Sequence, residues 1–239
     1  MKNPNGPYPG RQLFLGLTAD KKPAFVYLVT GRSPQSRERK ATPKENSIIM
    51  GPIGNLPYDH LRHYTAVKYD NSIGLMAVSN GIQTEAIFEA YKLLYNVKSP
   101  PAGSYLKKLM DGANSEPDSL NTPRIAGVIT NDKENGKPVY IVSIKIAGKP
   151  AFTWQVKPQP GTLTGVSTYH GNMESPGAFN TDKGLAELKC DAATPQALAD
   201  FIYEISAVTY QGDVIRVCAI GGVRTDNTWK VALVNRHKG

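Results

Sequence analysis

The stretch Gly31–Lys40 gathers several cationic side chains directly after an apolar run. Its cations are Arg32, Arg37, Arg39 and Lys40. A guanidinium presents a planar fork of donors that matches two oxygens of a phosphate or carboxylate at once. The stretch therefore indicates binding of an anionic group, although a solvated basic loop or a nucleic-acid patch would have the same composition.

Further polar side chains stand where apolar runs end, which is where binding and catalytic sites tend to form. They occur in Y-P-G-R (8–11), V-S-N-G-x-x-T-E (78–85), L-N-T-P-R-I-A (120–126) and S-T-Y (167–169), together with Tyr64 and Glu116. Taken singly, each has an ordinary explanation. Asn80 precedes a glycine as in many turns, Asn121 suits an Asx turn, and Arg124 suits a surface charge. The order in which they occur is the informative feature.

Apolar runs with alternation and β-branched residues predict about ten strands in successive hairpins. The expected strands cover 12–17, 24–30, 63–69, 73–79, 125–129, 139–146, 151–156, 162–168, 214–220 and 229–234. Helices are expected from Thr84 through Leu94, over 103–111 and from Thr194 to about 208, with Thr84 as the first N-cap. Hairpins imply antiparallel sheets, and helices grouped apart from strands imply α+β layers. No linker divides the chain, so we expect one domain over 1–239.

The composition is that of an ordinary globular protein: 239 residues, 40% hydrophobic and 20% charged. The net charge of +8 indicates an anionic partner such as a nucleotide, a phosphorylated metabolite or nucleic acid. Two isolated cysteines and four scattered histidines give no metal-ligand spacing, so no metal site is expected. No run approaches eighteen apolar residues and the first residues lack an apolar segment, which predicts a cytoplasmic protein without a membrane partner.

In their order, the motifs resemble those of the archaeal-type inosine-monophosphate (IMP) cyclohydrolase family. The resemblance covers roughly residues 8–170, about two thirds of the chain, and L-N-T-P-R-I-A and V-S-N-G with the following T-E are its most specific parts. It implies a four-layer α-β-β-α sandwich of two antiparallel sheets, like that of the N-terminal-nucleophile hydrolases. Residues 171–239 match weakly, so their role and a possible homo-oligomer stay open.

The resemblance also implies an enzyme of purine biosynthesis, a hydrolase acting on a cyclic amidine and running in the ring-closing direction. The carboxamide nitrogen of 5-formamidoimidazole-4-carboxamide ribotide (FAICAR) attacks the formyl carbon, and water leaves to give IMP. This chemistry needs orientation of a weak nucleophile, a cation or donor at the formyl oxygen, and an acid or base. It requires no cofactor, and none is expected.

The resemblance assigns catalytic roles to Arg37, Tyr64 and Glu116. Glu116 would be the acid or base, Tyr64 would orient the formyl group, and Arg37 would stabilise the developing oxyanion. Asp118, two residues beyond Glu116, is the alternative acid or base. The residues expected to bind the nucleotide substrate are Arg11, Arg32, Ser33, Asn80, Asn121, Thr122 and Arg124. Arg39 and Lys40 are expected to be solvated.

Two other functions fit parts of the pattern. A non-catalytic, nucleotide-binding paralogue of the same fold would keep the pocket but lose turnover. A nucleic-acid-binding protein would use the positive charge, but the basic residues are spread along the chain and no RNA-binding motif is present. The expected partner is therefore a small-molecule purine nucleotide, with no nucleic acid.

Overall fold

Six strands form the first of two large sheets in the computed structural model, which describes residues 8–97 and 102–237. The strands are β1 (Arg11–Leu17), β2 (Pro23–Thr30), β10 (Thr162–Ser167), β13 (Ala186–Lys189), β16 (Arg216–Thr225) and β17 (Thr228–Asn235). Their order is β13-β10-β1-β2-β16-β17, and all neighbours are antiparallel. The N-terminal hairpin therefore lies at the centre, between strands from the last third of the chain.

Seven strands form the second sheet, and they follow one another along the chain as an antiparallel meander. They are β3 (Arg39–Lys44), β4 (Ser47–Pro52), β5 (Tyr64–Asp70), β6 (Leu75–Ser79), β7 (Arg124–Asn131), β8 (Pro138–Lys145) and β9 (Phe152–Val156). Two short pairs lie outside both sheets: β11 (Tyr169–His170) with β12 (Gly177–Ala178), and β14 (Thr209–Tyr210) with β15 (Asp213–Val214).

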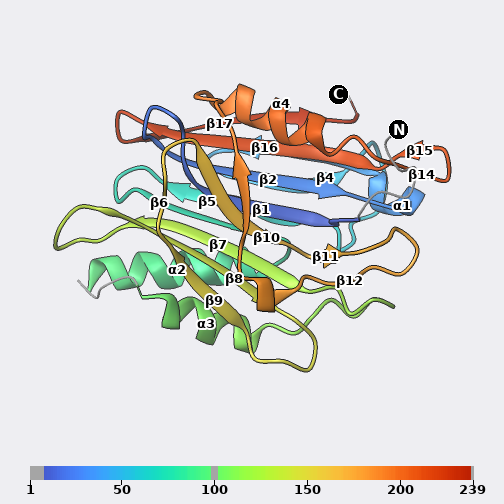
Figure 1. The fold of residues 1–239 in the computed structure, drawn as a ribbon, viewed down its shortest axis with the longest axis horizontal. Coiled ribbons are helices and arrows are strands. Elements are labelled where there is room, and N and C mark those ends of the chain that lie inside the picture. Colours follow the sequence, from blue (N-terminus) through green and yellow to red (C-terminus); the bar gives the residue numbers. More distant parts are fainter. Residues whose placement is uncertain (1–7, 98–101, 238–239) are drawn as a thin grey trace.

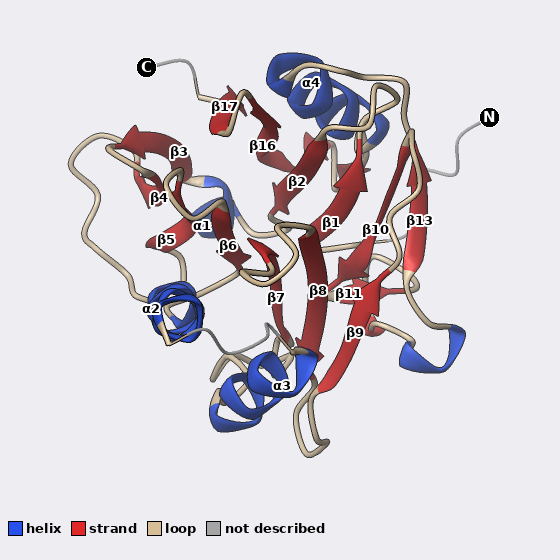
Figure 2. Ribbon diagram, turned by 90° about the vertical axis from the view of Figure 1, so that its left-hand side faces the viewer, coloured by secondary structure: helices blue, strands red, loops and turns tan. Residues whose placement is uncertain are grey.

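The three longest helices, α2 (Gln83–Asn96), α3 (Gly103–Gly112) and α4 (Pro195–Ile205), lie on the outer faces of the two sheets. The short helix α1 (Pro34–Arg37) and the 3-10 turn η1 (Thr181–Lys183) lie in connections between strands. Figure 1 shows α4 above the first sheet and α2 with α3 below the second, and Figure 2 shows the same arrangement from the side. The described helices are all too short or too polar to cross a lipid bilayer.

The two sheets pack face to face around the largest apolar cluster. Along β2, Phe25 and Tyr27 belong to this inter-sheet core. The alternate side chains Val26 and Leu28 pack with Leu198 of α4 instead, because successive residues of a strand point to opposite faces. Since β2 is covered on both faces, its sequence is an unbroken apolar run rather than an alternating one.

Most predicted strands and helices, and the α+β class with two antiparallel sheets, are confirmed. Three differences concern the site. The expected helix begins at Gln83, and the hydroxyl of Thr84 contacts Ser79 Oγ at 2.6 Å instead of capping the helix. The cationic stretch is not one loop, since it holds α1 and the start of β3. Arg39 is 2% exposed, so the prediction that it is solvated is wrong.

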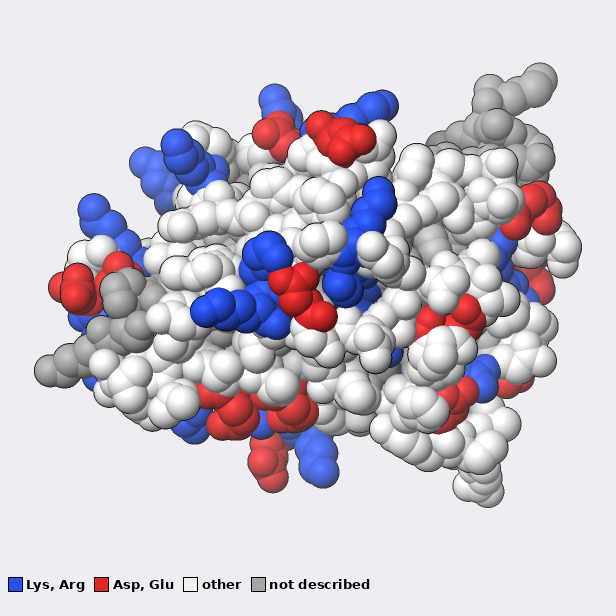
Figure 3. Space-filling view, turned by 90° about the horizontal axis from the view of Figure 1, so that it is seen from below, with Lys and Arg blue, Asp and Glu red and all other residues white. Residues whose placement is uncertain are grey.

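Charges on the helical side of the second sheet are largely paired. Lys68 of β5 contacts Glu85 at 2.6 Å and Glu89 at 3.1 Å, and Lys107 contacts Asp111 at 2.5 Å within α3. Figure 3 shows the molecule from below, with basic and acidic side chains interspersed on a mainly uncharged surface. The excess positive charge therefore does not form one continuous field on this face.

Candidate active site

One end of the two sheets collects most of the polar residues that the sequence singled out. In the first sheet, Arg11 opens β1 opposite Val29 near the end of β2. In the second sheet, Tyr64 opens β5, and Arg124 opens β7 beside the end of β6. Antiparallel pairing therefore places three motifs that are distant in the sequence at the same sheet end, where α1 and the β14–β15 pair also lie (Figure 1).

The local backbone explains why the first motif has a glycine at position 10. Its φ is +66°, and a Cβ at this position would lie 2.1 Å from Oγ1 of Thr168. That hydroxyl accepts a hydrogen bond from the backbone N–H of Arg11 at 3.1 Å, while Gly10 O accepts from Thr30 Oγ1 at 2.6 Å. Only glycine fits this close approach, which fixes the point where Arg11 enters the sheet.

Glu116 is the centre of a buried polar cluster and is 4% exposed. Its Oε1 accepts hydrogen bonds from Arg11 Nη2, from Arg124 Nη1 at 3.0 Å and from Asn80 Nδ2 at 3.4 Å. No hydrogen bond from the described residues reaches Oε2. Burial alone would lower the pKa of Arg11, but the adjacent Glu116 carboxylate outweighs it and raises that pKa further above its usual range. The two arginines therefore hold Glu116 through one carboxylate oxygen and leave the other without a hydrogen-bond partner among the described residues.

Asn80 holds this cluster to the second sheet. Its side-chain amide donates to Pro123 O at 2.8 Å, and its carbonyl Oδ1 accepts from Ile125 N at 2.8 Å. Asn80 therefore satisfies backbone groups at the start of β7 as well as reaching Glu116. The V-S-N-G and L-N-T-P-R-I-A motifs are adjacent in space because β6 pairs with β7, and the Asn80 amide extends this connection beyond the strand ends.

The loop before β7 is organised by Asp118 rather than by Asn121. Asp118 Oδ1 accepts from Thr122 N at 2.8 Å and from Leu120 N at 3.2 Å, and Thr122 Oγ1 donates to Oδ2. Asn121 is exposed and has a φ of +47°, a conformation that asparagine tolerates in turns. Asn121 shapes the turn and does not line the cavity described next, whereas Asp118 does.

A cavity of about 550 Å³ opens beside the Glu116 cluster, within the usual size of small-molecule sites (about 300–1,000 Å³). Its lining includes Arg11, Arg32, Ser33, Asp118 and Thr122 with the aromatic rings of Tyr8, Tyr169 and Tyr210. It thus combines two guanidiniums with hydroxyl groups and three aromatic rings. An anionic, partly aromatic ligand matches this lining.

The aromatic wall is held by contacts between distant segments. The rings of Tyr8 and Tyr169 stack at 5.5 Å, and the guanidinium of Arg32 lies 5.0 Å from the centre of the Tyr8 ring. Arg32 Nη1 also donates to Met173 O at 2.5 Å and Glu174 O at 3.0 Å. Ser33 caps α1 by accepting from Ser36 N at 3.2 Å. The segment after residue 170 therefore builds part of the cavity.

Tyr169 continues a chain of hydroxyl contacts toward Asp118. Because Thr122 gives its one hydroxyl hydrogen to Asp118, Tyr169 is the donor in the hydrogen bond between Tyr169 and Thr122. Burial raises the pKa of Tyr169 to about 12. Tyr169 is therefore protonated near neutral pH and can fill this donor role.

Tyr64 lies deeper, where the two sheets meet. Its hydroxyl is 2.8 Å from the hydroxyl of Tyr27 in β2, and both side chains belong to the inter-sheet core. Its phenol also lies close enough to the Arg11 guanidinium to stabilise the charged form of that arginine. The structure thus brings Tyr64 to the same end of the sheets as Glu116, near Arg11, but Tyr64 does not itself line the cavity.

The family model for IMP cyclohydrolase-like protein matches residues 8–228. The chain belongs to this family. An IMP cyclohydrolase of Methanocella arvoryzae is 24% identical over 230 residues, which cover 95% of this chain and 98% of the relative. One of Thermococcus kodakarensis is 26% identical over 234 residues, covering 94% and 96%.

Another relative has a higher sequence identity over a shorter stretch. An IMP cyclohydrolase of Methanococcus maripaludis is 35% identical over 128 residues, covering 53% of this chain and 60% of the relative. The chain thus spans less than two thirds of that relative's length. The family match itself extends through 171–228, a part in which the motifs alone showed only weak resemblance.

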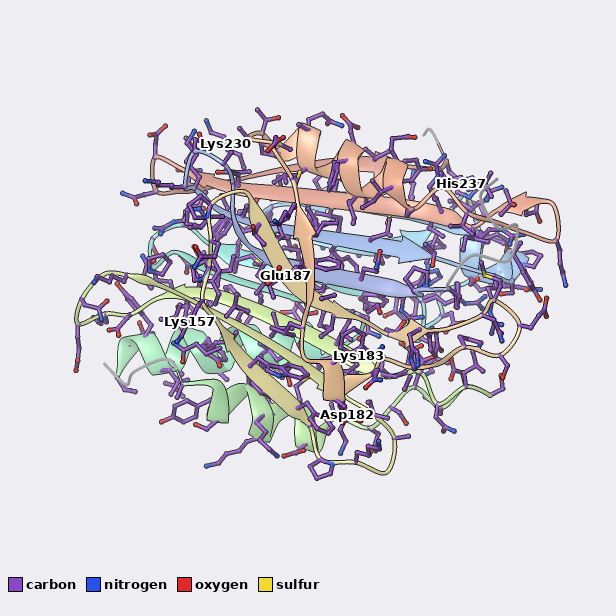
Figure 4. All side chains as sticks on the ribbon, in the orientation of Figure 1. Lys157, Asp182, Lys183, Glu187, Lys230 and His237 are labelled. Atoms are coloured by element: carbon purple, nitrogen blue, oxygen red, sulfur yellow. The ribbon has the colours of Figure 1, made fainter. Side chains whose placement is uncertain are left out.

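Of the three predicted catalytic residues, Arg37 is the one that makes no contact with the Glu116 cluster. Its Nη2 contacts Asp213 Oδ2 at 2.5 Å, and its Nη1 donates to Arg32 O at 2.5 Å and Gly31 O at 3.3 Å. It does not line the large cavity. Figure 4 shows His237 at the same end of the molecule, and a ring nitrogen of this histidine lies 2.8 Å from Arg37 O. The role of Arg37 stays a prediction.

A second cavity of about 480 Å³ lies on the other side of the cluster. Arg124 lines it together with Gln83 at the start of α2 and the stretch 112–115. Arg124 Nε donates to Asn114 O at 3.2 Å, so its guanidinium spans from this cavity to Glu116. Among the residues that the structure describes, no group of three or more His, Cys, Asp or Glu side chains could hold a metal ion.

Sequence reasoning missed several residues at this site. Tyr8 and Tyr169 stood inside quoted motifs but were given no role, although their motif positions were the available signal. Tyr27 and Tyr210 carried no signal, because each reaches the site only through packing of elements that are distant in the sequence. Arg39 stood in the cationic stretch but was expected to be solvated, whereas it is buried.

Proposed function

We propose that the protein is an IMP cyclohydrolase that closes the purine ring of FAICAR to IMP. The observation that carries this proposal is the buried Glu116 carboxylate, held through one oxygen by Arg11 and Arg124 beside a cavity lined by guanidiniums, hydroxyls and tyrosines. The names of the relatives support the same activity. The protein would act in de novo purine biosynthesis, as a cytoplasmic enzyme without a nucleic-acid partner.

The nucleotide would bind with its phosphate near Arg32 and Ser33. The Arg32 guanidinium is partly exposed at the cavity, and Ser33 stands at the start of α1 with its hydroxyl beside the cavity. The stacked and largely buried rings of Tyr8 and Tyr169 would form the wall against which the imidazole packs. This orientation would direct the formamido and carboxamide groups toward Arg11, Thr122 and the Glu116 cluster.

The ring-closing step needs two hydrogens to leave with the formyl oxygen as water. The carboxamide nitrogen forms the new C–N bond and gives up one hydrogen, and the formamido nitrogen gives up the other. Glu116 Oε2 would accept the first hydrogen and return it to the departing oxygen, while Arg11 and Arg124 hold the carboxylate in place through Oε1. Tyr64 would donate a hydrogen bond to the formyl oxygen as negative charge develops on it.

The fold is compatible with a structural relationship to the N-terminal-nucleophile hydrolases. One helix covers the first sheet and two cover the second, which is the layer order expected of a sandwich like that of the N-terminal-nucleophile hydrolases. We propose that relationship, together with one domain over 1–239, as part of the same assignment.

The proposal is tested by mixing purified protein with FAICAR and following the rise in ultraviolet absorbance as the purine ring closes. Closure well above the uncatalysed rate supports the cyclohydrolase. Tight binding of IMP in a calorimeter with no acceleration of closure would instead identify a non-catalytic nucleotide-binding paralogue. A salt-sensitive shift of an oligonucleotide, with no nucleotide binding, would favour nucleic acid.

A further inference from the structure

Two tyrosines from different sheets meet inside the core at the active-site end. Tyr27 of β2 is fully buried and Tyr64 of β5 is 4% exposed. Their hydroxyl oxygens are 2.8 Å apart in a cluster of mainly apolar side chains. Since a buried hydroxyl without a partner is costly, this contact fixes the position of both phenols across the sheet interface.

The direction of this hydrogen bond determines what Tyr64 can do. Each phenol has one hydrogen to donate and can also accept. If Tyr64 donated to Tyr27, its hydrogen would be used inside the core. If Tyr27 donates to Tyr64, the hydrogen of Tyr64 stays free to reach a ligand, and the accepted bond strengthens Tyr64 as a donor.

Two buried arginines lie at this end of the inter-sheet core. Arg11 opens β1, and Arg39 opens β3 two residues before the core residue Ala41, whose strand is joined to Tyr64 through β4.

Only one of the two arginines has a carboxylate partner. Arg11 is paired with Glu116. Arg39 is 2% exposed, has no carboxylate within 4 Å among the described residues, and donates through Nη1 only to Arg62 O at 3.3 Å. Its buried Nε has no hydrogen-bond partner in the described part of the chain. A buried guanidinium without a carboxylate partner destabilises the fold. Such a cost is more often tolerated at a functional site.

The electrostatic effect of these arginines reaches the tyrosine pair. Burial raises the pKa of Tyr27 well above its usual range, and the Tyr64 phenol raises it further. The positive charges of Arg11 and Arg39 oppose this rise. Both guanidiniums therefore favour negative charge at Tyr27, and Arg39 does so with no carboxylate within 4 Å among the described residues to cancel its charge.

We propose that Tyr27 and Arg39 are positioning residues for ring closure: Tyr27 donates its hydroxyl hydrogen to Tyr64, and Arg39 supplies the positive charge that polarises the pair. Tyr64 then keeps its own hydrogen for the formyl oxygen of the substrate. No proton leaves either tyrosine in this arrangement, which strengthens one hydrogen bond in the transition state. The inference rests on the proposed cyclohydrolase activity.

The matched test compares Tyr27→Phe with Tyr140→Phe. Tyr140 is 1% exposed, lies in the same inter-sheet core, and has a hydroxyl without a hydrogen-bond partner among the described residues. Both variants lose one buried hydroxyl, but only Tyr27→Phe alters Tyr64. We expect Tyr27→Phe to lower kcat about three- to tenfold while KM and the affinity for IMP change less than twofold. Tyr140→Phe should keep the kcat of the unaltered protein.

Arg39 gives a second, independent readout. Arg39→Met removes the charge and Arg39→Lys keeps it at similar size, so kcat should fall several-fold in the first and recover at least half of its value in the second. This pair decides the question if Tyr27→Phe fails to fold. Unchanged kcat in Tyr27→Phe, or equal losses in the two Arg39 variants, would overturn the inference and leave the proposed function standing. If the unaltered protein closes no ring, the proposed function fails first and the inference fails with it.

Discussion

The Nη2 atom of Arg37 lies 2.5 Å from Oδ2 of Asp213, the residue that opens β15. The hairpin β14–β15 carries Tyr210 and Gln211 into the lining of the large cavity. Arg37 also donates to Arg32 O at 2.5 Å. One guanidinium thus connects the two chain segments that enclose the expected phosphate position.

This connection predicts that Arg37 acts on substrate binding through Asp213. We expect Arg37→Ala and Asp213→Asn each to raise KM about two- to fivefold, which is the effect of losing a partly exposed ion pair. The kcat should change less than twofold in both, because neither residue contacts Glu116 or Tyr64. Steady-state kinetics of ring closure measures both constants.

A large loss of kcat in Arg37→Ala, without a matching loss in Asp213→Asn, would contradict this prediction. It would show that Arg37 leaves Asp213 when substrate binds and stabilises the oxyanion directly, as its sequence motif predicts. Lys40→Ala, in the same cationic stretch, is the control and should change neither constant.

Glu116 and Asp118 have different surroundings and should respond differently to loss of charge. Glu116→Gln should lower kcat at least 100-fold, the scale of a general acid or base, with IMP affinity reduced less than tenfold. Asp118→Asn should mainly lower the melting temperature and the IMP affinity, because both carboxylate oxygens of Asp118 accept hydrogen bonds that hold the loop. Circular dichroism checks that each variant is folded.

The reverse pattern would move the acid or base role to Asp118. A 100-fold loss of kcat in Asp118→Asn, with folding and IMP affinity retained, together with a mild effect of Glu116→Gln, is that pattern. Asp118 lines the cavity directly, so the structure allows a substrate group to reach it.

The sequence predicted most of the strands, including the edge strands β9 and β17, but missed the edge strands β3 and β13. β2 and β8 are apolar runs because both of their faces are covered. β3 (R-K-A-T-P-K) and β13 (A-E-L-K) each lie at one edge of their sheet and carry charges, with a proline in β3. Edge strands are commonly polar in this way, so their strand conformation comes from the neighbouring backbone rather than from their own residue types.

Site residues that lie within a sequence motif were predictable. Residues whose position depends on the packing of distant strands were not. The quoted motifs predicted the residues of the Glu116 cluster, and the structure brings Arg11, Asn80 and Arg124 to that carboxylate. The burial of Arg39 was predicted wrongly, because a basic residue in a cationic stretch is usually solvated. Its position on β3, facing the core, depends on pairing with β4 that its own residues do not reveal.

Arg32 should act on the phosphate rather than on the ring. Arg32→Met should weaken IMP binding about tenfold or more, because a charge-assisted contact to the phosphate is lost, whereas inosine, which lacks the phosphate, should bind with unchanged affinity. Calorimetric titration with both ligands measures the difference. Equal weakening of IMP and inosine would show instead that Arg32 matters through its contacts with Tyr8 and Met173 O, which build the cavity wall.

The pKa of Tyr169, raised by burial to about 12, predicts a loss of stability in alkali. The folded protein holds the phenolic proton more tightly than the unfolded chain, whose tyrosine pKa is about 10. The stabilisation is therefore complete below pH 10 and is lost as pH rises through 12, where the ionised phenol can no longer donate to Thr122. Urea unfolding between pH 8 and 11.5 should show a free energy of unfolding that falls above pH 10. Tyr169→Phe should be less stable at pH 8 and show a smaller fall, whereas an identical pH dependence in both proteins would show that Tyr169 ionises equally in the folded and unfolded states.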